Sequence, residues 1–181
     1  MKRWTPKQLG GAALASWLVH AIVLLRAGLP YDLFWAGNVA VLLIGAGLLL
    51  RKASPTAVGV LWLSLAAPLW MLEAALGGVF MPSTAAAYVA GAIAGVAGLR
   101  ALKLPARSWK TAAIALLALQ QFCRFTTPVR DNINFCVLIW YGWEGIFKTY
   151  PAFWICLSLL AAASFAATAA ALRRLSPASA A

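Results

Sequence analysis

Residues 53–72 read ASPTAVGVLWLSLAAPLWML, a run of 20 positions without a charged side chain. A helix needs about 20 mostly apolar residues to cross a bilayer. Further charge-free windows flank this one along the chain, and the chain as a whole is 64% hydrophobic and 10% charged. A soluble domain carries roughly 25% charged residues. The sequence therefore predicts an all-α, polytopic membrane protein and excludes a soluble globular domain.

Six transmembrane helices are expected when the charge-free windows are divided at their turn signals. The longest window, 74–99, is split because Gly77-Gly78 and Met81-Pro82-Ser83 interrupt it. The expected helices lie near 9–28, 32–50, 57–80, 84–101, 108–125 and 150–172. They form a single domain over 1–175, with an external loop at 126–149 and a disordered tail at 176–181.

The basic residues predict which side of the membrane each connection occupies. Of the 15 lysines and arginines, all but four fall before the first helix, after the sixth, or in the second–third and fourth–fifth connections. The other four are Arg26, Arg124, Arg130 and Lys148. Because cytoplasmic loops carry the excess of Lys and Arg, both termini are expected in the cytoplasm, and the chain in a bacterial inner membrane. The same pattern accounts for the net charge of +11 without a nucleic-acid partner.

Polar residues recur at one depth in the expected bundle. His20, Asn38 and Glu73 each lie roughly 9–12 Å below the outer surface, at about 1.5 Å per helical residue. Gln120 and Arg124 approach the same layer from the fifth helix. An ionisable group at membrane depth costs about 2.5–3.5 kcal/mol on insertion scales, so it usually faces a partner or water. We therefore expect these residues to line one outward-facing polar cavity.

Glu73 is the only acid inside an expected span, and two pairings are open to it. Beside Arg124 it would stay ionised and hold structure or a ligand headgroup. Beside His20 it would form a catalytic proton-transfer pair. The structural alternative is a buried pair that only fixes helix packing. The expected ligand-binding residues are Asn38, Gln120, Arg124, Arg130, Asp131, Asn132 and Asn134.

The external loop and the cysteines leave alternatives open. Residues 133–147 are apolar and aromatic but too short to span, so they predict either a re-entrant, interfacial segment or a plain cap over the bundle. Cys123 and Cys136 both fall near the external face, where a disulfide is one alternative and two free thiols the other. With a single histidine and no metal-ligand spacing, neither a metal nor another cofactor is expected.

Small residues on the fourth expected helix form a G-x-x-x-G motif at Gly91 and Gly95. Such motifs let two helices approach closely. The motif predicts either packing within the bundle or a face for a homo-oligomer or a partner membrane protein.

Two short stretches carry a resemblance to a known family. They are Leu29-Pro30-Tyr31-Asp32-Leu33 and the segment from Arg124 to Pro151, with Pro128, Asn132-Ile133-Asn134, Trp143 and Tyr150 between. With the six-helix plan, they resemble the YwaF-like bacterial membrane proteins over about residues 29–165. That family is similar to a eukaryotic transmembrane acyltransferase that moves fatty acyl chains between phospholipids with a cysteine and a histidine.

This chain departs from the family at the entry to the second helix. It has Asp32 and no cysteine where the family tends to have a histidine and then a cysteine. The resemblance therefore implies the architecture and an outward polar pocket, but not acyltransferase activity.

Three functions are compatible with these features, and the residues do not decide whether the protein is an enzyme. The first is a protein that binds or processes a membrane lipid, with Arg124, Arg130, Asn132 and Asn134 contacting headgroup oxygens. The second is a subunit that binds or transports a small cationic or polar solute. The third is an accessory subunit of a membrane complex, docked through its glycine motif and aromatic loop.

Overall fold

The computed structural model describes residues 4–175, which are all-helical with no strand. The α-helices are α1 (Pro6–Arg26), α2 (Ala36–Leu49), α3 (Ala53–Ala75), α4 (Pro82–Leu102), α5 (Ser108–Thr126) and α6 (Tyr150–Leu175). Short 3₁₀ helices are η1 (Pro30–Phe34), η2 (Val129–Asp131) and η3 (Ile133–Phe135). Four helices, α1, α3, α4 and α6, are long and apolar enough to cross a membrane. The predicted all-α membrane class is confirmed, whereas the predicted tail at 176–181 lies outside the described residues.

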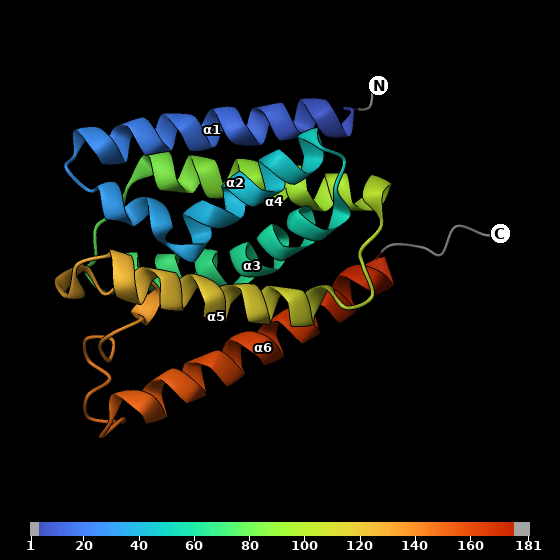
Figure 1. Cartoon of the computed structure of the whole chain (residues 1–181). Coiled ribbons are helices and arrows are strands. Elements are labelled where there is room, and N and C mark those ends of the chain that lie inside the picture. Colours follow the sequence, from blue (N-terminus) through green and yellow to red (C-terminus); the bar gives the residue numbers. More distant parts are fainter. Residues whose placement is uncertain (1–3, 176–181) are drawn as a thin grey trace.

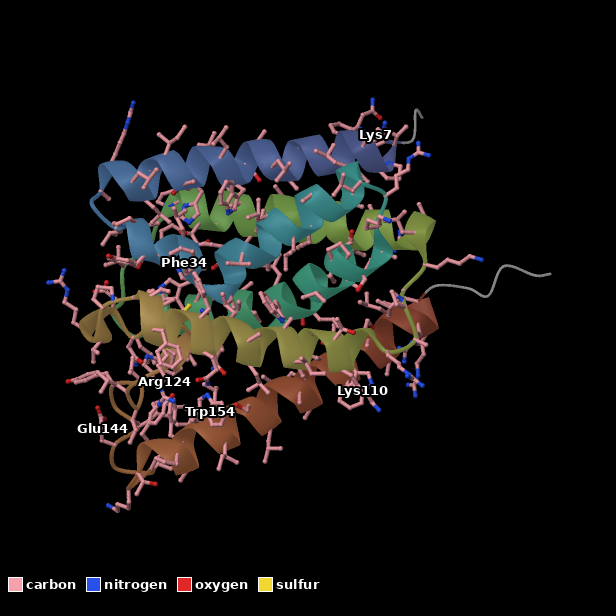
Figure 2. The ribbon with its side chains drawn as sticks, viewed as in Figure 1. Lys7, Phe34, Lys110, Arg124, Glu144 and Trp154 are labelled. Carbon is pink, nitrogen blue, oxygen red and sulfur yellow. The ribbon has the colours of Figure 1, made fainter. Side chains whose placement is uncertain are left out.

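Successive α-helices alternate in direction, so the start of α1 and the end of α6 lie at the same end of the bundle (Figure 1). We call this the basic end, and the opposite end, with residues 27–35, 76–81 and 127–149, the loop end. In the described part the basic end carries Lys7, Arg51, Lys52, Arg100, Lys103, Arg107, Lys110, Arg173 and Arg174. All four acids of the chain, Asp32, Glu73, Asp131 and Glu144, lie at the loop end. Figure 2 shows Lys7 and Lys110 at the basic end and Arg124 and Glu144 at the loop end.

Helices α2, α3 and α4 pack closely because each contact has a glycine on one side, which leaves room for the neighbouring helix. Gly59 of α3 lies against α2, and a Cβ added there would come within 2.5 Å of the Ala40 carbonyl oxygen. A Cβ on Gly91 of α4 would meet a Val41 methyl at 3.0 Å, and Gly95 packs on Val60. The glycine motif is therefore used inside the bundle. Both glycines are buried in this single chain, and a homo-oligomer or a partner membrane protein remains a prediction.

Helices α5 and α6 cover the α3 side of this four-helix unit, and α6 diverges from α5 toward the loop end (Figure 1). Near the basic end, the Ser64 hydroxyl donates to the Thr168 hydroxyl and links α3 to α6. The polar residues of the bundle gather at this loop end, around the cavity described below.

The start of α2 and the end of α3 differ from the expected bounds, and both differences change which residues lie at the loop end. Helix α2 begins at Ala36 because the chain first forms η1, which the Asn38 amide fastens by donating to the Asp32 carbonyl oxygen at 2.7 Å. Helix α3 ends at Ala75, before Gly77, whose φ of +100° is left-handed. Such a residue is a common helix terminator. Glu73 therefore lies in the last turn of α3, not seven residues inside it.

Candidate functional site

A cavity of about 430 Å³ opens between the helices at the loop end. Residues of all six α-helices line it, together with parts of η1, η3 and the external loop. The polar and charged residues of its lining are His20, Asp32, Asn38, Glu73, Thr84, Gln120, Asn134 and Ser158. The structure thus brings together His20, Asn38, Glu73, Gln120 and Asn134, five of the residues predicted to form one polar site.

The most buried polar residues of the cavity lining are His20 and Asn38, which are 1% and 4% exposed. The Nδ1 of His20 lies 3.0 Å from the hydroxyl oxygen of Ser83 on α4. Its Nε2 and the Oδ1 of Asn38 are buried and form no hydrogen bond within the described residues. Because a buried polar atom is normally paired, these two atoms are the clearest candidates to contact a ligand.

Glu73 lines the cavity from its mouth, where the side chain is exposed. Within residues 4–175 it forms no ion pair, and the only salt bridge joins Arg130 to Asp131. Neither predicted partner is therefore engaged: His20 contacts Ser83, and the Arg124 guanidinium lies 5.3 Å from the centre of the Tyr150 ring. The predicted catalytic pair of His20 and Glu73 is not formed, because the early end of α3 places Glu73 nearer the surface.

Asp32 is the second acid of the lining, and it was not among the residues predicted for the site. It lies in η1, half-buried, and burial raises the pKa of its carboxyl group above the ordinary value. A hydrogen bond from Trp35 opposes this shift, while the negative charges of Asp131 and Glu73 add to it. A cation bound near Asp32 and Glu73 would relieve this repulsion.

Asn134 joins three parts of the chain at the cavity wall. Its Oδ1 accepts from the Ala36 N–H at 2.6 Å, and its Nδ2 donates to the Phe34 carbonyl oxygen at 2.8 Å. The Gln120 amide donates to the backbone carbonyl of Asn134 at 3.0 Å. The Trp154 indole in turn donates to the Gln120 side chain at 3.2 Å. Both amides are thus engaged in holding the external loop onto α2 and α5.

The other predicted ligand residues lie outside the cavity. Arg130, Asp131 and Asn132 line a second, more open hollow of about 340 Å³ on the external loop. The Asn132 side chain is engaged locally, since its Oδ1 accepts from the Leu138 N–H at 2.9 Å. Arg124 is exposed at the end of α5, because the helical turn directs it away from the bundle.

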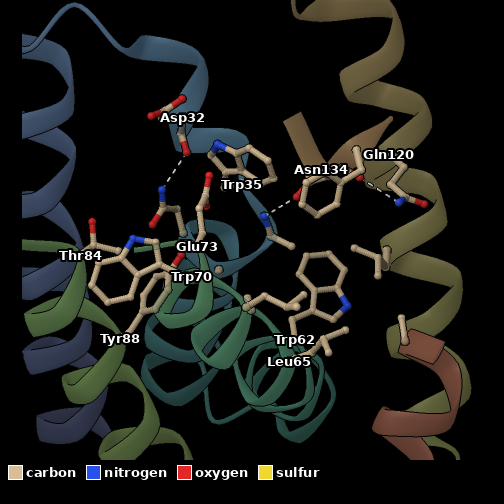
Figure 3. A pocket seen from close by; sticks show the side chains of 18 of the residues that line it. Asp32, Trp35, Trp62, Leu65, Trp70, Glu73, Thr84, Tyr88, Gln120 and Asn134 are labelled. Carbon is tan, nitrogen blue, oxygen red and sulfur yellow. Dashed lines mark hydrogen bonds between the residues drawn. The ribbon is translucent and has the colours of Figure 1, made fainter. Parts of the chain in front are cut away.

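Aromatic side chains surround the acids at the loop end of the cavity. Figure 3 shows Trp35, Trp70 and Tyr88 grouped with Asp32 and Glu73 on one side of it. The Trp70 and Tyr88 rings meet edge to face, with centroids 5.8 Å apart. The sequence alone does not show that these aromatic residues share a cavity with an acid, because the fold brings them together.

The cysteines do not contribute to the cavity. All three are free; Cys123 and Cys136 are buried in one small cluster with Ile133, whereas Cys156 is exposed on α6. The alternative of two free thiols at Cys123 and Cys136 is therefore the one observed. No group of three or more His, Cys, Asp or Glu residues that could hold a metal lies within the described range.

The fold is that of a helical membrane protein with a cavity at one end of its bundle. Comparison of the chain with protein-family models, with curated proteins and with solved structures finds no match. The YwaF-like resemblance is thus neither supported nor contradicted, and it remains a prediction.

Proposed function

We propose that all six α-helices are embedded in a bacterial inner membrane, with the basic end in the cytoplasm. The excess of Lys and Arg at that end supports this orientation, because positively charged loops stay cytoplasmic. Helix α2, with 14 residues, is only about 21 Å long. It is embedded as part of the bundle, because it packs against α1, α3 and α4. The preceding η1 lies at the outer face.

We propose further that the cavity binds the headgroup end of a membrane lipid from the outer leaflet. The observation that carries this proposal is the position of the cavity mouth. Val79 lines the cavity and is 75% exposed, and the large apolar side chains around it are exposed as well. These neighbours are Met71, Leu72, Leu76 and Phe80. An apolar surface of this kind faces lipid in a bilayer, so an amphiphile can enter without crossing water.

The walls of the cavity suit the apolar part of such a ligand. Away from the acids, the lining is formed by Leu65 and Leu69 of α3, Leu157 and Phe165 of α6, and Leu116 of α5. The volume falls within the range of about 300–1,000 Å³ that small-ligand pockets occupy. The headgroup and the adjoining chain segment fit this space, while the rest of the chain stays in the bilayer.

Native mass spectrometry of gently purified protein tests the proposal. The variant Ala66→Trp fills the cavity, because Ala66 is half-buried in its lining. Ala163→Trp, on the exposed face of α6, makes the same change outside the cavity. Wild type and Ala163→Trp are expected to retain a defined lipid that Ala66→Trp loses. Equal lipid retention by all three proteins would overturn the proposal.

A further inference from the structure

The charges of the cavity lining have one sign. Asp32 and Glu73 are two of the four acids in the chain, and within residues 4–175 neither a lysine nor an arginine lines the cavity. The bases nearest in sequence to the lining lie outside it, and Arg26 is exposed at the end of α1. Arg124 lies over the Tyr150 ring, and Arg130 pairs with Asp131 at 3.4 Å. A phosphate or carboxylate would therefore meet only like charge among the lining side chains, whereas a cation would meet two carboxylates.

The aromatic rings beside these acids favour the same sign of charge. The face of an aromatic ring is electron-rich and attracts cations, most strongly for tryptophan. Trp35, Trp70 and Tyr88 all line the cavity on the side of the two acids (Figure 3). Tyr88 is held rigidly, because its ring packs directly on Gly37, where any larger residue would displace it.

The unpaired acceptor beside the two acids defines the ligand further. Within residues 4–175 the Oδ1 of Asn38 is buried beside the His20 ring and forms no hydrogen bond of normal geometry, while the amide nitrogen of the same side chain donates to the Asp32 carbonyl oxygen. An unsatisfied buried acceptor is unfavourable, and a hydrogen bond from a ligand N–H would remove this cost. A protonated primary amine carries three N–H donors and a positive charge, so it matches the acceptor, the acids and the rings together.

We infer that the polar end of this cavity binds the protonated primary amine of an amphiphile, held by Asp32 and Glu73 and donating to the Asn38 Oδ1. The inference deepens the proposed function, because it names the headgroup class of the lipid. The same ammonium chemistry could come from a water-soluble amine, so the experiment separates the two sources.

Binding is measured by tryptophan fluorescence of the full chain in a neutral maltoside detergent, since Trp35 and Trp70 report on the cavity. The probes are hexylammonium, its chainless relative methylammonium, and the anionic and neutral relatives hexyl sulfate and hexanol. Hexylammonium is expected to bind at least tenfold more tightly than each of the other three. Glu73→Gln and Asp32→Asn are each expected to weaken this binding at least tenfold.

The matched control is Glu144→Gln, which removes the same charge at the loop end outside the cavity. It is expected to leave hexylammonium binding unchanged. Equal binding of hexyl sulfate or hexanol by the wild type would overturn the amine inference, whether or not the variants fold, and would leave the lipid proposal standing. Methylammonium binding as tightly as hexylammonium would instead overturn the lipid source while the ammonium site stood.

Discussion

The two ends of the bundle are built in different ways. Toward the basic end, α2, α3 and α4 approach closely through glycines such as Gly59 and Gly95, and apolar side chains fill the space between them. At the loop end, α6 diverges and polar groups line a cavity, while hydrogen bonds from one asparagine hold the loop in place. Close packing therefore stabilises one end, whereas the other end is packed less tightly around a cavity.

Removing Asn134 is expected to have the largest effect on the loop end. Asn134→Ala leaves the Ala36 N–H and the Phe34 carbonyl without their partner, at about 1–3 kcal/mol for each buried group. We expect a loss of about 3 kcal/mol and faster proteolysis within 136–149, measured by thermal unfolding in detergent and by limited digestion. Asn132→Ala, which breaks bonds only within the loop, should cost less. Equal effects of the two variants would contradict this role of Asn134.

The close packing toward the basic end is tested at Gly59. Gly59→Ala forces a methyl group against the Ala40 backbone oxygen, which cannot move aside as a side chain would. Overpacking of this kind costs about 1–3 kcal/mol, so we expect a lower melting temperature. Gly11→Ala is the control, because nothing lies within 4 Å of its added Cβ. It should leave the melting temperature unchanged or raise it slightly.

The acids of the cavity predict how stability depends on pH. Burial raises the pKa of Asp32, so the folded state binds a proton more readily than the unfolded state. This contribution to stability is full below the ordinary carboxyl pKa of about 3.9 and is lost as pH rises through the folded value. Asp32→Asn should therefore flatten the fall in melting temperature of the wild type above about pH 4. Parallel pH profiles for the two proteins would contradict the burial of this carboxyl.

Arg124 is expected to have the smallest effect. The sequence predicted it as a ligand residue, whereas its guanidinium lies over the Tyr150 ring outside the cavity. An exposed cation–π contact contributes about 0.5–1 kcal/mol. Arg124→Met should therefore lower stability by less than about 1 kcal/mol and leave hexylammonium binding unchanged. A tenfold loss of binding in this variant would show that the arginine reaches the ligand.

Hydrophobic runs predicted the helical membrane class and most of the helix positions, because the length of an apolar segment can be counted from the sequence alone. Depth arithmetic also placed His20, Asn38 and Gln120 in one cavity, since residues at one level of a bundle meet when their helices are neighbours. Glu73 also lines the cavity, but its depth was misjudged because α3 ends at Ala75, shortly before the left-handed Gly77, which a hydrophobic window does not register.

The loop residues show the other limit of sequence reasoning. Asn132 and Asn134 were expected to meet a ligand, but both adopt left-handed backbone conformations, with φ of +41° and +56°. Their side chains bond to the backbone within and around the loop. Asparagine is common both in turns and in binding sites, so its residue type does not distinguish these roles. Asp32 and the aromatic residues near it were missed because their proximity depends on η1 and on the packing of α4.

The most direct test of an occupied loop end is photo-crosslinking with a diazirine-bearing single-chain alkylamine in phosphatidylcholine nanodiscs, mapped by peptide mass spectrometry. We predict labels concentrated at 62–73 of α3 and 157–165 of α6, where the cavity is lined. Ala66→Trp should suppress these labels, and Ala163→Trp should not. Labels spread evenly over the exposed apolar surface, including Leu18 and Val19 of α1, would contradict a cavity that holds the amphiphile.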